Sequence, residues 1–205
     1  MKALTYCKIQ KNADPERLCE VFDCREYIDG LKNRKSRASI NESCAALFLL
    51  AKTFKNEFHE NTSELRYKKD EKGRPYFENR TDIRFSLSHS GEYAVCAVSN
   101  EGDIGVDIEK IPTDTKYEKV KERFLSDGEK NRAGDSAEGF ATVWTRKEAY
   151  YKYKGGQITD LDSEKDKDVT YETFDIDGEY KISVCYERNE KTVIEEPKAL
   201  KNGNF

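Results

Sequence analysis

The sequence predicts an α+β fold made of two similar halves, each with a long helix packed on an antiparallel sheet. Helical periodicity is concentrated in two long stretches, and strand-like runs of apolar residues follow each of them. A short repeat supports the same plan, because SGEYAVCAV at 90–98 resembles DGEYKISVCY at 177–186. Chance similarity is the alternative, since hairpins share turn chemistry. We expect halves at 1–102 and 103–195, a flexible tail at 196–205, and an active site at the junction of the halves.

The main element of the first half is a helix at 38–57, whose thick apolar face runs from Ala45 to Phe54. Short strands are expected after it, and the last two, separated by the turn sequence NEGD, are expected to form a hairpin. These strands lie at Arg74–Phe77, Ile83–Leu87, 93–99 and 104–110.

The second half centres on a helix at Glu138–Lys154. A shorter helix is expected at Lys116–Leu125, and Ser126 and Glu129 have the capping-box spacing that begins another helix. The last two strands are expected to form a hairpin around the turn sequence Asp-Gly at 177–178.

The composition excludes several classes of protein. Charged residues make up 37% and hydrophobic residues 36% of the 205 residues, but 11% aromatic residues argue against disorder. A net charge of −4 gives no overall attraction to nucleic acid or to an anionic membrane. MKALTYCKIQ lacks the apolar run of a signal peptide, and no stretch reaches the length of a membrane span, so we expect a cytoplasmic protein. The six cysteines include no CxxC pair, which argues against a thiolate zinc site.

Two acidic residues lie side by side in the expected strand at 104–110. Because successive side chains of a strand point to opposite faces, Asp107 and Glu109 share one face with Gly105. Two like charges held close raise each other's pKa, and a hard divalent cation relieves that repulsion. The alternative is a solvated strand face near a sheet edge. Gly105 favours close approach by a ligand or by backbone.

The helix at Glu138–Lys154 carries a third carboxylate. Residues four apart share a helix face, so one stripe contains Phe140, Trp144, Glu148 and Lys152. The two aromatic residues look like core anchors, which directs Glu148 toward burial, where a carboxylate needs a partner. That partner is either Lys152, in an i,i+4 salt bridge worth about 0.3–0.5 kcal/mol, or a cation shared with Asp107 and Glu109.

Five motifs occur in an order that is specific as a set. They are GRP at 73–75, FSLSHSG at 85–91, GVDIE at 105–109, the segment from Arg123 to Glu129, and WTRKEAYYK at 144–152. Together they resemble the signatures of the 4′-phosphopantetheinyl transferase superfamily. The form of GVDIE and the length of two halves are similar to its surfactin-synthetase-activating (Sfp-type) branch. Outside the region that holds these motifs, the resemblance depends on length and plan.

The resemblance implies a Mg²⁺-dependent transferase. It would move the 4′-phosphopantetheine arm of coenzyme A to a serine of an apo acyl- or peptidyl-carrier protein and release adenosine 3′,5′-bisphosphate. Asp107, Glu109 and Glu148 would hold Mg²⁺ against the pyrophosphate of coenzyme A. Glu148 would also accept the serine proton, directly or through a water, and Lys152 would neutralise or protonate the leaving phosphate. These residue types suit phosphoryl transfer, which depends mainly on positioning and charge neutralisation.

The nucleotide end of coenzyme A requires cations and hydrogen-bond donors. The resemblance assigns Arg37, Ser88 and His89 to its phosphates, the last two to the 3′-phosphate. Arg74 stands where the family has lysine, and it keeps the charge but presents a planar fork. On charge alone, the segment LKNRKSR that contains Arg37 is equally typical of a solvated basic loop.

Two other functions compete with this interpretation. A metal-dependent phosphohydrolase or nuclease would also use clustered carboxylates, but it would not need the SHSG and WxxKE motifs in this order. A catalytically inactive module that binds carrier proteins would not need Asp107, Glu109, Glu148 and Lys152. Partners are therefore expected to be coenzyme A and a carrier protein, without nucleic acid or membrane. A monomer is expected, because the duplicated plan lets one chain form the site.

Overall fold

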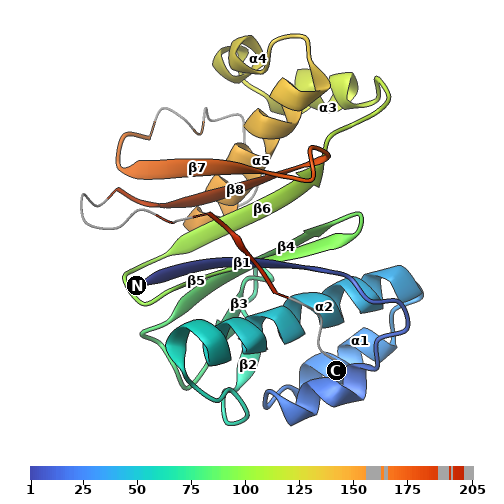
Figure 1. Ribbon diagram of the computed structural model, residues 1–205, viewed down its shortest axis with the longest axis vertical. Helices are drawn as coiled ribbons and strands as arrows, with labels where there is room; N and C mark the ends of the chain where they lie inside the picture. The colour runs from blue at the N-terminus through green and yellow to red at the C-terminus, as the bar shows by residue number, and fades with distance from the viewer. Residues whose placement is uncertain (156–162, 164–165, 189–193, 195, 201–205) are drawn as a thin grey trace.

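The computed structural model describes the chain except for residues 156–162, 164–165, 189–193, 195 and 201–205 (Figure 1). Its strands are β1 (Lys2–Lys8), β2 (Tyr67–Lys69), β3 (Pro75–Phe77), β4 (Arg84–Ser90), β5 (Tyr93–Ser99), β6 (Ile104–Lys110), β7 (Val169–Ile176), β8 (Tyr180–Glu187) and β9 (Lys198–Ala199). Its helices are η1 (Pro15–Glu20), α1 (Arg25–Lys32), α2 (Arg37–Thr53), the π-helical turn η2 (Phe54–Phe58), α3 (Tyr117–Phe124), α4 (Asp127–Ala133) and α5 (Ala137–Lys154).

Two sheets form the centre of the molecule (Figure 1). The first has the strand order β4-β5-β1-β9, the second has the order β6-β8-β7, and β2 and β3 form a separate small pair. Helix α2 packs on the outer face of the first sheet and α5 on the outer face of the second. The inner faces share one core, with Val95 and Ala97 from the first sheet and Val106 and Ile182 from the second. This arrangement confirms the predicted α+β class.

Both sheets repeat one plan. β1 pairs antiparallel with β5, which pairs with β4; in the second sheet β6 pairs with β8, which pairs with β7. Each half therefore runs strand, long helix and hairpin, as β1-α2-β4-β5 and β6-α5-β7-β8. The repeated sequences at 90–98 and 177–186 each contain a hairpin turn and most of the strand that follows it. We propose a boundary at residues 102–103, because β6 takes the place in the second sheet that β1 takes in the first.

A tyrosine next to each of the two hairpin turns forms a hydrogen bond with the other turn. The Tyr180 hydroxyl accepts a hydrogen bond from the backbone amide of Glu92 at 3.3 Å, and the Tyr93 hydroxyl donates to the carboxylate of Asp177. Their rings meet edge to face with centroids 5.0 Å apart. Gly91 permits this contact, since a Cβ at that position would lie 2.5 Å from the Tyr180 hydroxyl oxygen. The repeated sequence thus supplies both turns and a contact between the halves.

One predicted pairing is wrong, because β5 and β6 do not form a hairpin. β5 pairs with β4 and β1, whereas β6 pairs with β8. The turn at Gly91 already joins β4 to β5, and Ile104 and Val106 of β6 pack into the core between the sheets. The predicted β7–β8 hairpin is confirmed, and Asp177 and Gly178 both have the positive φ of a tight hairpin turn.

The structure adds elements near both ends of the chain. β1 and α1 were not predicted, and the expected helix at 38–57 is α2 continued by the π-helical turn η2. Inside the expected flexible tail, Lys198–Ala199 form β9, which pairs parallel with β1 at Thr5 and Tyr6, so backbone hydrogen bonding holds this segment. Residues 201–205 of that tail lie outside the described residues. In the part of the chain that the structure describes, no helix has both the length and the apolar character needed to cross a membrane.

Candidate active site

Strand β6 separates apolar from acidic side chains. Ile104, Val106 and Ile108 point into the core between the sheets, as the alternation predicts. The opposite face carries Gly105 against α5, so close that a Cβ on Gly105 would lie 2.0 Å from the carbonyl oxygen of Ala149. The close approach expected at this glycine is therefore made by backbone. Asp107 and Glu109 follow on the same face, next to α5.

Helix α5 brings the third carboxylate to this face. One side of the helix is anchored by Lys147, which is fully buried and makes a 2.7 Å ion pair with the equally buried Glu129 of α4. Glu129 also completes the predicted capping box with Ser126. The following residue, Glu148, is half-buried and interacts electrostatically with Asp107 across the contact of α5 with β6.

Asp107 is the most buried acid of the three, with 4% of its surface exposed. Its Oδ1 accepts hydrogen bonds from the Ser88 hydroxyl and from Lys152 Nζ, both at 2.7 Å. Lys152 therefore makes its ion pair with Asp107 on the neighbouring strand. The Oδ2 atom is buried and has no hydrogen-bond partner among the described residues. A buried carboxylate oxygen without a partner is costly, which identifies this atom as a place where a cation would bind favourably.

Burial and neighbouring charges raise the pKa values of Glu109 and Glu148. Burial raises the pKa of Glu148 to about 7, and repulsion from Asp107 and Glu109 adds to this rise, while Lys152 opposes it. Burial also raises the pKa of Glu109, again with a contribution from Asp107. The three carboxylates therefore share one electrostatic environment. Over the described residues, however, no three Asp, Glu, His or Cys side chains form a cluster ready to hold a metal ion.

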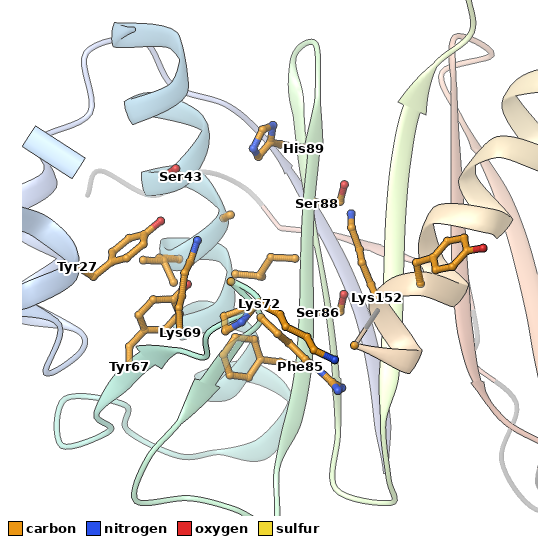
Figure 2. Close-up of a pocket in the computed structure, with 18 residues that line it drawn as sticks. Tyr27, Ser43, Tyr67, Lys69, Lys72, Phe85, Ser86, Ser88, His89 and Lys152 are labelled. Carbon is orange, nitrogen blue, oxygen red and sulfur yellow. The ribbon is translucent and has the colours of Figure 1, made fainter. Parts of the chain in front are cut away.

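A cavity of about 420 Å³ opens on the other side of Lys152 (Figure 2). Its walls come from α1, α2, the segment from β2 to β3, β4 and the end of α5. Among the described residues that line it there is no carboxylate, and its basic side chains are Lys69, Lys72, Arg74, His89 and Lys152. In a chain with a net charge of −4, such a lining indicates a cavity for an anion.

The structure brings three of the four predicted nucleotide-binding residues to this cavity. Ser88, His89 and Arg74 line it. His89 Nδ1 lies 3.6 Å from a Glu42 carboxylate oxygen, and burial lowers its pKa although Glu42 opposes this effect. Arg37 does not line the cavity, because its guanidinium donates to a backbone carbonyl in the loop after β1 at 2.6 Å.

Sequence reasoning missed the other cations of the cavity. Lys69 and Lys72 belong to a segment of mixed charge, YKKDEKGRP, which has no periodicity that would indicate a binding role. Lys69 is placed 5.2 Å above the ring of Tyr27, a residue of the unpredicted helix α1. Neither lysine makes an ion pair within the described part of the chain. Partial burial, together with nearby Arg34, lowers the pKa of Lys69. The only available signal was the density of lysines before the GRP motif.

Comparison with known proteins shows what this site is similar to. Residues 103–197, which contain all three carboxylates, match the family model of the 4′-phosphopantetheinyl transferase superfamily. Over this region the chain is similar to that superfamily, which confirms the resemblance seen in the motifs.

Individual relatives agree. The chain is 34% identical over 137 residues to "4′-phosphopantetheinyl transferase" of Bacillus subtilis, covering 56% of this chain and 60% of the relative. It is 37% identical over 101 residues to AcpT of Salmonella typhi, covering 45% and 53%. With Sfp of Bacillus subtilis strain 168 it shares 28% identity over 159 residues, covering 67% and 70%, which supports the Sfp-type branch. The chain thus spans 60% and 53% of the first two relatives' lengths. These relatives give no support to a phosphohydrolase, a nuclease or an inactive module.

Proposed function

We propose that this chain transfers the 4′-phosphopantetheine moiety of coenzyme A to a serine of an apo acyl- or peptidyl-carrier protein. One observation carries the proposal: a cavity with basic side chains and no carboxylate in its described lining ends at Lys152, beside three mutually repelling carboxylates. Coenzyme A carries phosphates that suit the cavity, and a pyrophosphate that would meet the carboxylates through a cation. The names of the relatives support the same activity.

Mg²⁺ is the cation that we propose for the carboxylates. Mg²⁺ typically takes one or two protein carboxylates and completes its shell with waters and substrate phosphates, so a closed protein cage is not required. The partnerless Oδ2 of Asp107 suits such an ion, with Glu109 and Glu148 as further ligands. When bound, Mg²⁺ would supply charge stabilisation on the pyrophosphate. The residues present therefore fit the ion.

Glu148 is the proposed base. A pKa of about 7 lets it accept a proton near neutral pH. As the serine oxygen of the carrier bonds to phosphorus, its proton passes to Glu148, directly or through a water, and the bond to adenosine 3′,5′-bisphosphate breaks. Lys152 lies between the acids and the cavity, where its ammonium group would neutralise or protonate the leaving phosphate.

The cavity side chains are proposed to bind coenzyme A. Ser88, His89 and Arg74 are assigned to its phosphates by the motifs and line the cavity, and Lys69 is added on its position there. Arg37 stays a prediction from the resemblance, because it lies outside the lining. We further propose that the enzyme acts in the cytoplasm as a monomer, without nucleic acid or membrane as partner.

The test is a transfer reaction with purified protein, coenzyme A and Mg²⁺. An apo acyl-carrier protein and an apo peptidyl-carrier protein serve as acceptors, and mass spectrometry measures the gain of phosphopantetheine on each. Asp107→Ala is expected to abolish transfer at an unchanged circular dichroism spectrum, and extra Mg²⁺ is expected to rescue it little. The matched control is Asp114→Ala, an exposed acid outside the site. No transfer by the parent to either carrier would refute the function, and near-normal transfer by the Asp107 variant would refute the metal site.

A further inference from the structure

The two sheets meet along β4 and β6, and side chains make the hydrogen bonds there. β4 begins the order of the first sheet and β6 begins that of the second, so each is an edge strand that lies beside the other. Edge strands leave alternate backbone amides without a ladder partner. Here the Val106 amide donates to the Ser86 hydroxyl at 3.0 Å, and the Lys110 amide donates to the Ser90 hydroxyl at 3.2 Å.

These serines form a regular row. Ser86, Ser88 and Ser90 alternate along β4 and therefore share one face, which we call the serine row. Figure 2 shows Ser86 and Ser88 on the side of β4 that faces Lys152. Ser86 and Ser90 are four residues apart in β4. The two amides that they bind, at Val106 and Lys110, are also four residues apart in β6. A displacement of β6 along β4 by one residue, about 3.3 Å, would break both contacts.

The serine row also holds the carboxylates. Ser88 donates to Asp107 Oδ1 at 2.7 Å, and Ser90 donates to Glu109 Oε2 at 3.0 Å. The Ser90 hydroxyl thus accepts from the β6 backbone and donates to a β6 side chain at once, which uses its donor and one acceptor site. Among the described residues, no other side chain both accepts a hydrogen bond from the backbone of the opposite sheet and donates one to an acid of the site.

We propose that Ser86 and Ser90 are positioning residues that set the register of β6 against β4, and so place Asp107 and Glu109 at the end of the cavity. The inference rests on the proposed function for its catalytic consequence. The inference about the register of β6 is independent of that function. The pairing of β6 with β8 fixes β6 only within its own sheet, so a further contact has to fix it against β4. The serine row fixes the second sheet against the strand that carries Ser88 and His89, which are proposed to bind coenzyme A.

The experiment compares Ser90→Ala, Ser90→Thr and Ser99→Ala. The last is the control, since Ser99 is a buried serine of β5 whose hydroxyl accepts a hydrogen bond from the nearby Glu101 amide. NMR hydrogen exchange of the Lys110 amide and kcat and KM of transfer are measured on each folded variant. We expect Ser90→Ala to speed exchange at Lys110 about tenfold and to lower kcat about tenfold, with KM for coenzyme A unchanged. Ser90→Thr keeps the hydroxyl and is expected to retain most of the protection at Lys110 and most of kcat. The same is expected of Ser99→Ala.

Two outcomes would overturn the proposal. One is a Ser90→Ala variant whose exchange rate at Lys110, or whose kcat, equals that of the parent. The other is a Ser90→Thr variant as impaired as Ser90→Ala, because the hydroxyl would then not be the cause. If the parent transfers no phosphopantetheine, the proposed function fails by itself. The exchange measurement still decides whether the serine row holds β6.

Discussion

Replacing Gly105 by alanine tests the closest approach in the site. The added Cβ would lie 2.0 Å from the Ala149 carbonyl oxygen and 2.5 Å from the Tyr153 amide nitrogen, and both are backbone atoms of α5. Ordinary van der Waals contact begins at 3.4 Å, so α5 would have to move away from β6 by about 1.4 Å. Overpacking of this kind costs about 1–3 kcal/mol, and we expect the upper end, because a helix backbone cannot rotate aside as a side chain does.

The same displacement should reduce activity. Glu148 and Lys152 are carried by the segment of α5 that would move, and a misplacement of about 1 Å can cost about a hundredfold in rate. Denaturant unfolding followed by circular dichroism gives the change in the free energy of unfolding, and the transfer reaction gives kcat. Gly30→Ala is the matched control. Gly30 lies in α1, where an added Cβ would meet nothing within 4 Å, so this variant should gain about 0.5–1 kcal/mol. A Gly105→Ala protein with the stability and kcat of the parent would refute the reasoning.

Two further predictions concern single lysines. Lys69→Ala should raise the KM for coenzyme A by roughly ten- to a hundredfold and leave kcat unchanged, since a charged hydrogen bond is worth about 1.5–3 kcal/mol. Lys68→Ala removes a lysine outside the cavity and should not raise this KM. Equal KM values in the parent and the Lys69 variant would exclude Lys69 from the site. Lys147→Met should cost about 3–5 kcal/mol of unfolding free energy by leaving Glu129 buried without its partner, and adding Glu129→Gln should recover part of it. Burial tends to raise the pKa of Glu129, but hydrogen bonds led by that from Lys147 lower it overall. The ion pair should therefore stabilise the parent fully above the pKa of Glu129 in the unfolded state and lose its effect as the pH falls through the lower pKa in the folded state. If the free energy of unfolding of the double variant falls with acid in the same way as that of the parent, this reasoning is contradicted.

Local patterns in the sequence predicted most elements but not all their partners. The alternation in β6 placed Asp107 and Glu109 on one face, and capping residues and periodicity located α4 and α5. Adjacency along the chain suggested that β5 and β6 would pair, but both edges of β5 are taken by β1 and β4, and β6 packs across the shared core from it. β6 belongs to the second repeat and finds its partner β8 about 80 residues later in the chain, beyond the reach of any local rule.

The same limit of local sequence patterns applies to the site. Helix periodicity offered Glu148 as the partner of Lys152, because it relates only residues within one helix. The partner in the structure, Asp107, comes from a strand that packs beside the helix. Lys69 was overlooked for a related reason: its position depends on the unpredicted helix α1, where Tyr27 lies beneath its ammonium group. Motif resemblance singled out Ser88 and His89, which line the cavity, but it gave no sign that Ser86 and Ser90 face β6.

The pairing of β9 with β1 has a consequence for how the protein is made. β5, which pairs with β1, follows it about 90 residues later in the sequence. The other neighbour of β1, Lys198–Ala199, follows nearly 200 residues after it and is therefore synthesised well after β5. Between the synthesis of β5 and that of β9, β1 keeps one row of backbone groups open to other chains, and an open edge of this kind is a template for aggregation. The pairing of β9 at Thr5 and Tyr6 covers part of that edge.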